Sequence, residues 1–123
     1  MLDVLVADDD PNVRESLTRA LTEAGHRVEQ AHDGAQAIVL AHGGQFDVAI
    51  LDVQMPRLGG LSVLRRLRRW APDTEVVLMT SFGNVLDAVT AFRDGAVDYL
   101  VKPFDPVLLA QKVSRSSARR REP

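Results

Sequence analysis

The feature that most constrains this chain is an alternation, repeated five times, between a short apolar run and a longer segment with helical spacing. Val-rich runs at Asp3 to Ala7, Asp47 to Leu51 and Thr74 to Thr80 predict strands buried on both faces. Shorter or more polar runs at Arg27 to Ala31 and Asp98 to Val101 predict edge strands. Such an alternation requires parallel strands with right-handed crossovers. The sequence therefore predicts an α/β fold, a three-layer αβα sandwich around a five-stranded parallel sheet.

Capping residues mark where the helices are expected to begin. Asp10 precedes Pro11, Asp33 precedes Gln36 by three positions, and Asp105 precedes Pro106, all of which are patterns typical of helix N-termini. The expected helices run from about Pro11 to Ala24, from Asp33 to Gly43, from Gly60 to Trp70, from Asn84 to Arg93, and onward from Pro106. In the fourth of these helices, the spacing predicts an inward face made of Val85, Ala88, Val89 and Phe92.

Length and composition limit the class of protein. With 123 residues, 46% of them hydrophobic and 26% charged, the chain has the size and apolar content of one globular domain. Residues 1–113 are expected to form it, and residues 114–123, which have no apolar face, are expected to be a frayed helix end leading into a linker and an output domain. We expect a cytoplasmic protein, because the sequence shows neither a signal peptide nor a membrane span. The net charge of −2 predicts no direct contact of this domain with nucleic acid.

Polar residues follow four of the five predicted strands. Asp8 and Asp9 come after the first strand, Asp52 after the third, Thr80 ends the fourth, and Lys102 follows the fifth. Each residue alone has an ordinary explanation as a cap, a turn residue or a solvated side chain. Because the carboxyl ends of parallel strands lie at one edge of the sheet, the five residues are expected to meet there, where ligands bind in such folds.

Three carboxylates at one edge predict a metal site. At a separation of about 4 Å, two carboxylates repel each other by roughly 4 kcal/mol, so either their pKa values rise or a cation binds between them. Oxygen ligands suit Mg²⁺, whereas the absence of cysteine and the scattered histidines disfavour zinc. A lysine, a hydroxyl and a divalent cation around one carboxylate can neutralise a phosphoryl group. Asp52 is the expected nucleophile, because a carboxylate can form an acyl phosphate.

The segments VLVADDDP, LDVQMPRLGGL, MTSFGNVLDAV and DYLVKPFD together resemble the receiver domain of two-component response regulators over residues 2 to 113. The resemblance implies a flavodoxin-like (βα)5 fold with strand order 2-1-3-4-5. It also implies that Asp52 is the phosphorylated residue, that Asp9 binds Mg²⁺ directly and Asp8 through water, and that Gln54 adds a main-chain carbonyl.

The same resemblance assigns roles to residues near the last two strands. Thr80 would bind one phosphoryl oxygen and Lys102 another, Tyr99 would be an aromatic switch residue, and Lys102–Pro103 would be a cis peptide bond. The phosphoryl donor would be a histidine kinase, so that the chain would be a phosphoacceptor that assists its own phosphorylation and dephosphorylation, not an enzyme. The surface of the fourth helix, fifth strand and fifth helix would change on phosphorylation and could form a homodimer.

The segment SFGNVLDAVTAFRDGAVDYLVKPFD further resembles receivers of the nitrogen-regulation type, which precede other domains in transcription activators. A stand-alone receiver that acts through protein contacts is the alternative. Phe82, two residues beyond Thr80, is expected to hinder attacking water and lengthen the lifetime of the phosphorylated state. Two other classes stay open on the residues alone: a small Mg²⁺-dependent phosphohydrolase, for which no cap insertion is present, and a flavin-binding or scaffolding αβα protein.

Overall fold

Strands and helices alternate along the chain as the hydrophobic pattern predicts. The computed structural model describes the backbone of residues 1–81 and 85–121 and the side chains of residues 1–81 and 87–115. In that part of the chain, the strands are β1 (Asp3–Ala7), β2 (Arg27–Ala31), β3 (Val48–Asp52), β4 (Glu75–Thr80) and β5 (Asp98–Val101). The helices are α1 (Pro11–Glu23), α2 (Gly34–Gly43), α3 (Gly60–Trp70), α4 (Val85–Arg93) and α5 (Pro106–Arg121).

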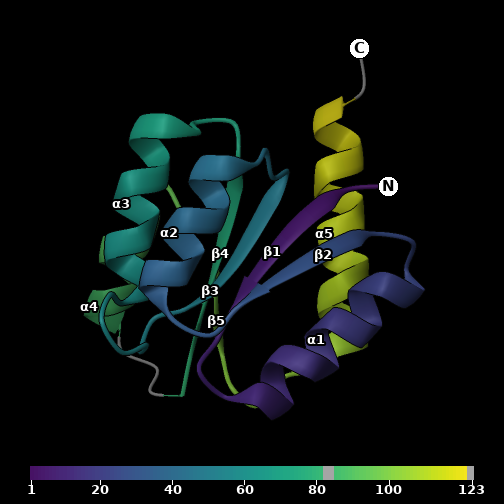
Figure 1. The fold of residues 1–123 in the computed structure, drawn as a ribbon, viewed down its shortest axis with the longest axis horizontal. Helices are drawn as coiled ribbons and strands as arrows, with labels where there is room; N and C mark the ends of the chain where they lie inside the picture. The colour runs from purple at the N-terminus through teal and green to yellow at the C-terminus, as the bar shows by residue number, and fades with distance from the viewer. Residues whose placement is uncertain (82–84, 122–123) are drawn as a thin grey trace.

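The strands form one parallel sheet in the order β2-β1-β3-β4-β5. Both this order and the placement of β2 and β5 at the edges confirm the predictions. Helices α2, α3 and α4 cover one face of the sheet, on the left of Figure 1, and α1 and α5 cover the other. The fold is therefore the three-layer αβα sandwich that the sequence indicates.

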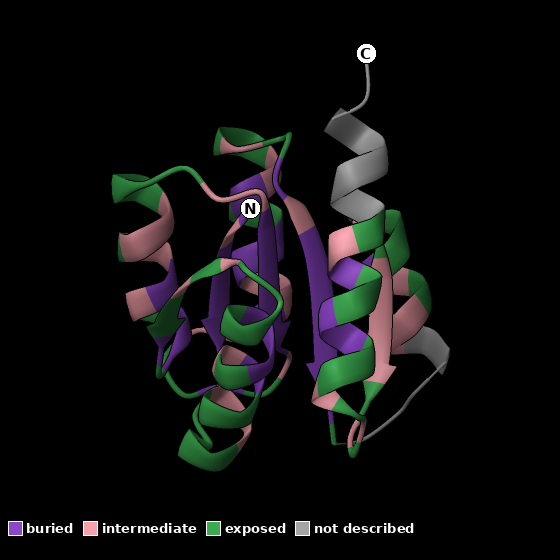
Figure 2. Cartoon of the chain, turned by 90° about the vertical axis from the view of Figure 1, so that its right-hand side faces the viewer, coloured by how far each residue is buried: buried purple, intermediate pink, exposed green. Residues whose placement is uncertain are grey.

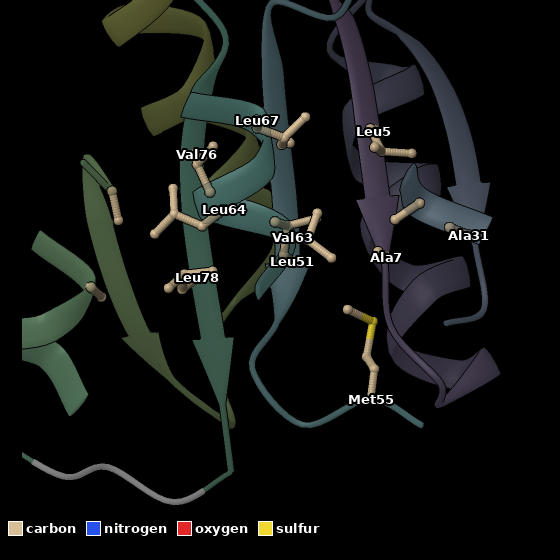
Figure 3. Packing of buried hydrophobic residues seen from close by; sticks show 14 residues of the cluster. Leu5, Ala7, Ala31, Leu51, Met55, Val63, Leu64, Leu67, Val76 and Leu78 are labelled. Carbon is tan, nitrogen blue, oxygen red and sulfur yellow. The ribbon is translucent and has the colours of Figure 1, made fainter. Parts of the chain in front are cut away.

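Alternate residues of the inner strands supply two separate cores. Leu5 and Leu51 face the layer that contains α3, where they pack with Leu64 and Leu67 (Figure 3). The residues that alternate with them along the same strands, such as Ile50 of β3, face α1 and α5. All of these side chains are almost fully buried, and each contributes roughly 1.5–3 kcal/mol relative to an exposed position. This burial on both faces holds the ends of the inner strands in fixed positions.

The predicted caps are present. The Asp10 carboxylate accepts a hydrogen bond from the Asn12 N–H at 2.9 Å, and the Asp33 carboxylate accepts one from the Gln36 N–H at 2.7 Å. The Asp105 carboxylate accepts a hydrogen bond from the Val107 N–H at 2.9 Å. Each bond satisfies an N–H group that a helix terminus leaves without an intrahelical partner. Local sequence therefore determines where α1, α2 and α5 begin.

The predicted inward face of α4 is wrong in part. Val89 is 47% exposed and Phe92 is 50% exposed, whereas Ala91 is fully buried. The helix covers the edge strand β5 and its neighbourhood, so a small alanine at the contact allows close packing and the larger side chains turn outward. The expected start at Asn84 lies outside the described residues, and so does the side chain of Val85.

Helix α5 continues further than the expected frayed end. Its backbone is helical through Arg121, so most of the segment 114–123 extends α5. Leu109, Ala110 and Val113 face the sheet, while Val107 and Leu108 face outward, as the alternating burial of this helix in Figure 2 shows. None of the described helices has both the length and the apolar content needed to span a membrane.

Candidate functional site

The carboxyl ends of the neighbouring strands β1 and β3 bring three carboxylates together. Asp8 follows β1 directly, and Asp52 is the last residue of β3, which pairs with β1. Asp9 extends the β1–α1 connection over the same edge. One carboxylate oxygen from each of the three residues lies within 4.8 Å of the others. The structure therefore brings together the acidic residues that the sequence predicts at one site.

Asp8 is fixed by its main chain as well as by its side chain. Its N–H donates to the Ala31 carbonyl at 3.1 Å, and its carboxylate accepts the Asp10 N–H at 2.9 Å. The side chain has no exposed surface, whereas Asp9 is exposed. Asp8 is thus a rigid part of the site, and Asp9 presents its carboxylate to solvent.

Asp52 is buried with only 4% of its surface exposed. Its carboxylate accepts the Gln54 N–H at 3.1 Å. Burial raises the pKa of Asp52 to about 6; the Gln54 N–H opposes this shift, the negative charge of Asp8 adds to it, and Lys102 also opposes it. Asp52 therefore stays mostly ionised at neutral pH, but its charge is held at a free-energy cost.

The loop that follows β3 brings the start of α3 close to the main chain of Asp52 and Val53. A Cβ atom on Gly60 would lie 2.4 Å from the Asp52 carbonyl oxygen, and one on Gly59 would lie 2.8 Å from the Val53 carbonyl oxygen. The Gly60 N–H donates to that same Val53 oxygen at 3.0 Å. Larger residues would push α3 away, so glycine at these positions keeps the helix start next to Asp52.

Lys102 joins the two buried acids. Its Nζ lies 2.7 Å from an Asp8 carboxylate oxygen and 3.3 Å from an Asp52 carboxylate oxygen. The Lys102–Pro103 peptide bond is cis, as expected, and the Lys102 N–H donates to the Thr80 carbonyl at 2.7 Å. Burial lowers the pKa of Lys102, but its bonds to Asp8 and the charge of Asp52 outweigh that effect and raise it. Lys102 is therefore a permanent cation at this edge.

Thr80 and Tyr99 lie beside this group on β4 and β5. Thr80 ends β4 at the same edge and is 1% exposed. Burial raises the pKa of Tyr99, the charge of Asp87 raises it further, and the Thr80 hydroxyl lowers it. Tyr99 pairs in register with Leu78, two residues before Thr80 on the adjacent strand β4, so the two predicted switch residues lie on the same face of neighbouring strands.

The donor set fits a small divalent cation. Asp8, Asp9 and Asp52 offer hard oxygen ligands, and three carboxylates with one lysine leave an excess of negative charge. Gln54 lies at the site through its bond to Asp52, while the metal role of its carbonyl stays a prediction. Phe82 lies outside the described residues.

Arg14 is a residue of this region that the motifs do not predict. Its Nη1 donates to the Asp8 carbonyl at 2.8 Å and its Nε donates to the Gln30 side chain at 3.2 Å. One signal that could have found it is its place in the second turn of α1, the helix that follows the acidic loop directly.

Residues 4–114 match the family model of the response regulator receiver domain, and the chain belongs to this family. It is 42% identical over 102 residues to the transcriptional regulatory protein TcrA of Mycobacterium tuberculosis and 46% identical over 101 residues to the response regulator MprA of Mycobacterium ulcerans. These alignments cover 83% and 82% of the chain but only 40% and 44% of the relatives.

Solved structures agree with this family. The Francisella response regulator 1452 receiver domain superposes with a TM-score of 0.91 at 30% identity, covering 98% of this chain and 100% of that one. DrrB of Thermotoga maritima, described as an OmpR/PhoB homologue, gives 0.87 at 31% identity, covering 99% of this chain and 55% of that one. NtrX of Brucella abortus gives 0.85 at 30% identity, covering 98% and 29%. DrrB and NtrX match this chain with similar TM-scores and identities, so these comparisons do not distinguish subtypes of receiver. The nitrogen-regulation subtype therefore stays a prediction.

Proposed function

We propose that the chain is a phosphoacceptor switch in the cytoplasm, in which Asp52 receives a phosphoryl group from the phosphohistidine of a histidine kinase. The observation that carries the proposal is the arrangement of Asp52 itself. It is buried beside Lys102 at 3.3 Å and lies within 4.8 Å of two further carboxylates. A buried group of like charges opposes folding, so such a site is expected where chemistry requires it.

The chain's own residues can perform the transfer. An ionised Asp52 oxygen attacks phosphorus, the bond from phosphorus to the histidine nitrogen breaks, and the electron pair of that bond leaves on the imidazole. Asp52 needs no base, because at neutral pH its carboxyl is mostly ionised with a pKa of about 6. Lys102 and the Thr80 hydroxyl stand at the same edge to bind phosphoryl oxygens.

Asp8, Asp9, Asp52 and the Gln54 carbonyl would hold Mg²⁺ at this edge. When bound, the ion neutralises charge on the carboxylates and on the phosphoryl group. The same carboxylates also place Lys102 between Asp8 and Asp52, so the lysine is already in position before a phosphoryl group arrives. Transfer of this kind depends mainly on positioning and charge neutralisation, which these residues supply.

The signal would pass through Thr80 and Tyr99. A phosphoryl group on Asp52 would attract the Thr80 hydroxyl, and the neighbouring Tyr99 ring would repack against it. Changing a two-state population from 1:99 to 99:1 needs about 5.5 kcal/mol, which a few charge-assisted hydrogen bonds can provide. The surface of α4, β5 and α5 would respond, and its exposed Val89, Phe92 and Val101 could then pair with a second receiver.

Control of transcription is the output that the relatives support, because TcrA is named a transcriptional regulatory protein. The chain spans about two-fifths of the curated relatives' length, so the output domain is part of the proposal. A stand-alone receiver that acts by protein contact is the second candidate. Membership of the receiver family argues against the phosphohydrolase and flavin-binding alternatives.

The test is intact mass spectrometry after incubation with acetyl phosphate and Mg²⁺. We expect the mass of one phosphoryl group to be added, and Asp52→Asn to abolish the addition. Asp47→Asn is the matched control, because Asp47 is the acid next to the other end of β3. A phosphoryl group that persists on Asp52→Asn, or the absence of any addition to the native chain, would contradict the proposal. Continuous turnover of a small phosphate ester would instead favour the phosphohydrolase.

A further inference from the structure

We infer that Arg14 is a positioning residue for the divalent cation: it holds the Asp8 main chain so that the acidic loop keeps its ligands together. Arg14 lies in α1 and is partly buried. Its Nη1 donates to the Asp8 carbonyl oxygen at 2.8 Å, and its Nε donates to the Gln30 side-chain oxygen at 3.2 Å. The inference rests on the metal-binding part of the proposed function and does not require phosphorylation.

Arg14 completes a set of bonds that fix Asp8 from several sides. The Asp8 N–H binds the Ala31 carbonyl of β2, and the two carboxylate oxygens bind the Asp10 N–H and Lys102. The carbonyl oxygen is the remaining polar group of the residue, and it is Arg14 that binds it. Without Arg14, the peptide that joins Asp8 to Asp9 would lose a restraint, and the exposed Asp9 carboxylate would sample more positions.

The guanidinium suits this role because it donates in two directions from one rigid plane. One arm holds the loop after β1 and the other holds Gln30 in the edge strand β2, so the side chain links α1, the loop and the sheet. A lysine would keep the positive charge but could not reproduce both bonds from one plane. The fork, in addition to the charge, therefore distinguishes Arg14 from other cations.

Charge and position predict opposite effects on metal affinity. A nearby cation repels Mg²⁺, so removal of Arg14 would tighten binding if only its charge mattered. If Arg14 positions the ligands, its removal weakens binding, as changes in residues behind the direct ligands do by about 10–100-fold. A purely structural role would lower thermal stability and leave the affinity of the folded protein unchanged. The sign of the change therefore identifies the role.

The experiment is isothermal titration with Mg²⁺ alone on the native chain and on Arg14→Met, Arg14→Lys and Gln30→Ala. We expect Arg14→Met to raise Kd about tenfold and Arg14→Lys to recover little of the loss. Gln30→Ala should have a smaller effect in the same direction; because Gln30 is exposed, this variant also tests the inference if Arg14→Met does not fold. Arg19→Met, an exposed arginine on the same helix, is the control and should match the native chain.

Amide hydrogen exchange of metal-free protein gives a second readout. In Arg14→Met we expect faster exchange at Asp8, whose N–H donates to the Ala31 carbonyl of β2, and at Asp10, whose N–H donates to the Asp8 carboxylate, with unchanged exchange in the centre of β3. An unchanged or lower Kd for Arg14→Met in folded protein would overturn the role of Arg14 and leave the proposed function standing. A native chain that binds no Mg²⁺ would overturn both.

Discussion

The neighbouring strands β1 and β3 each have an acid at or next to both ends, and the four acids have very different surroundings. At the amino end, Asp3 is half-exposed beside Arg27 at 3.5 Å, and the Asp47 carboxylate accepts the Asp3 N–H at 2.8 Å. At the carboxyl end, Asp8 and Asp52 are buried and share the ammonium group of Lys102. The aspartates at the amino end of these strands are thus exposed to solvent or hydrogen-bonded to the main chain. Those at the carboxyl end are buried next to each other.

This difference separates stabilising carboxylates from functional ones. The acids at the amino end satisfy main-chain or solvent partners, so they are compatible with the stability of the fold. At the carboxyl end, burial and the charge of Asp8 raise the pKa of Asp52, which means that ionised Asp52 works against folding. This unfavourable contribution to stability lies at the edge of the sheet where parallel αβα folds bind ligands.

The largest change in the free energy of unfolding is expected from Asp52→Asn at alkaline pH. Since the pKa of Asp52 is about 6 when folded and 3.8 when unfolded, the folded state binds more protons between these values. Native stability therefore falls as pH rises from about 4 to above 6. The asparagine side chain of the variant does not titrate in this range, so the variant should be more stable than the native chain by about 3 kcal/mol at pH 8 and by little at pH 4.

Urea unfolding at the two pH values, without Mg²⁺, measures that effect. A variant that is less stable than the native chain at pH 8 would show that Lys102 more than compensates for the burial of Asp52. The carboxyl end would then be no different in kind from the amino end.

A smaller effect of opposite sign is expected at the amino end. Asp47→Ala removes the carboxylate that accepts the Asp3 N–H, and it should lower the free energy of unfolding by about 1 kcal/mol. The same urea experiment at pH 8 measures it. If Asp47→Ala stabilised the chain as Asp52→Asn should, acids at both ends would oppose folding, and the distinction between the ends would fail.

The smallest effect on stability is expected from the titration of His26, which lies next to the amino end of β2. Its Nδ1 accepts the Leu2 N–H at 3.1 Å, and its Nε2 bonds the Ser114 hydroxyl. Burial lowers the pKa of His26, the N-terminal amino group lowers it further, and Asp47 opposes them. The stability contributed by neutral His26 is present above pH 6.5 and is lost as pH falls below it.

Titration of the His26 ring by NMR gives the direct measurement, and its midpoint should lie below 6.5. A midpoint above this value would mean that Asp47 dominates the local charge. The amino end would then favour a cation, contrary to the direction expected from the structure.

Sequence reasoning succeeded where the determinants are local or follow from strand direction. Caps such as Asp10 and Asp105 act within three residues, and parallel strands necessarily bring Asp8, Asp52 and Lys102 to one edge. The strand-end motifs do not include Arg14, and its contact with Gln30 depends on how α1 lies against β2.

The orientation of α4 shows a second limit. Helical spacing identifies a set of apolar residues, but Val89 and Phe92 face outward because the helix is positioned by the edge strand and by the small Ala91. A helix over a sheet edge has few neighbours, so its apolar periodicity does not determine which side is buried. The helical extension of α5 through Arg121 is likewise not visible in a segment without an apolar face.

The most direct measurement is the free energy of unfolding of three proteins with and without Mg²⁺ at pH 8. A ligand that binds only the folded state stabilises it by about 2.7 kcal/mol at one hundred times Kd. We expect Mg²⁺ to stabilise the native chain and Asp47→Ala equally, and Asp52→Asn much less. The absence of any gain in the native chain, or an equal gain in Asp52→Asn, would contradict a metal site built on the carboxyl end of β3.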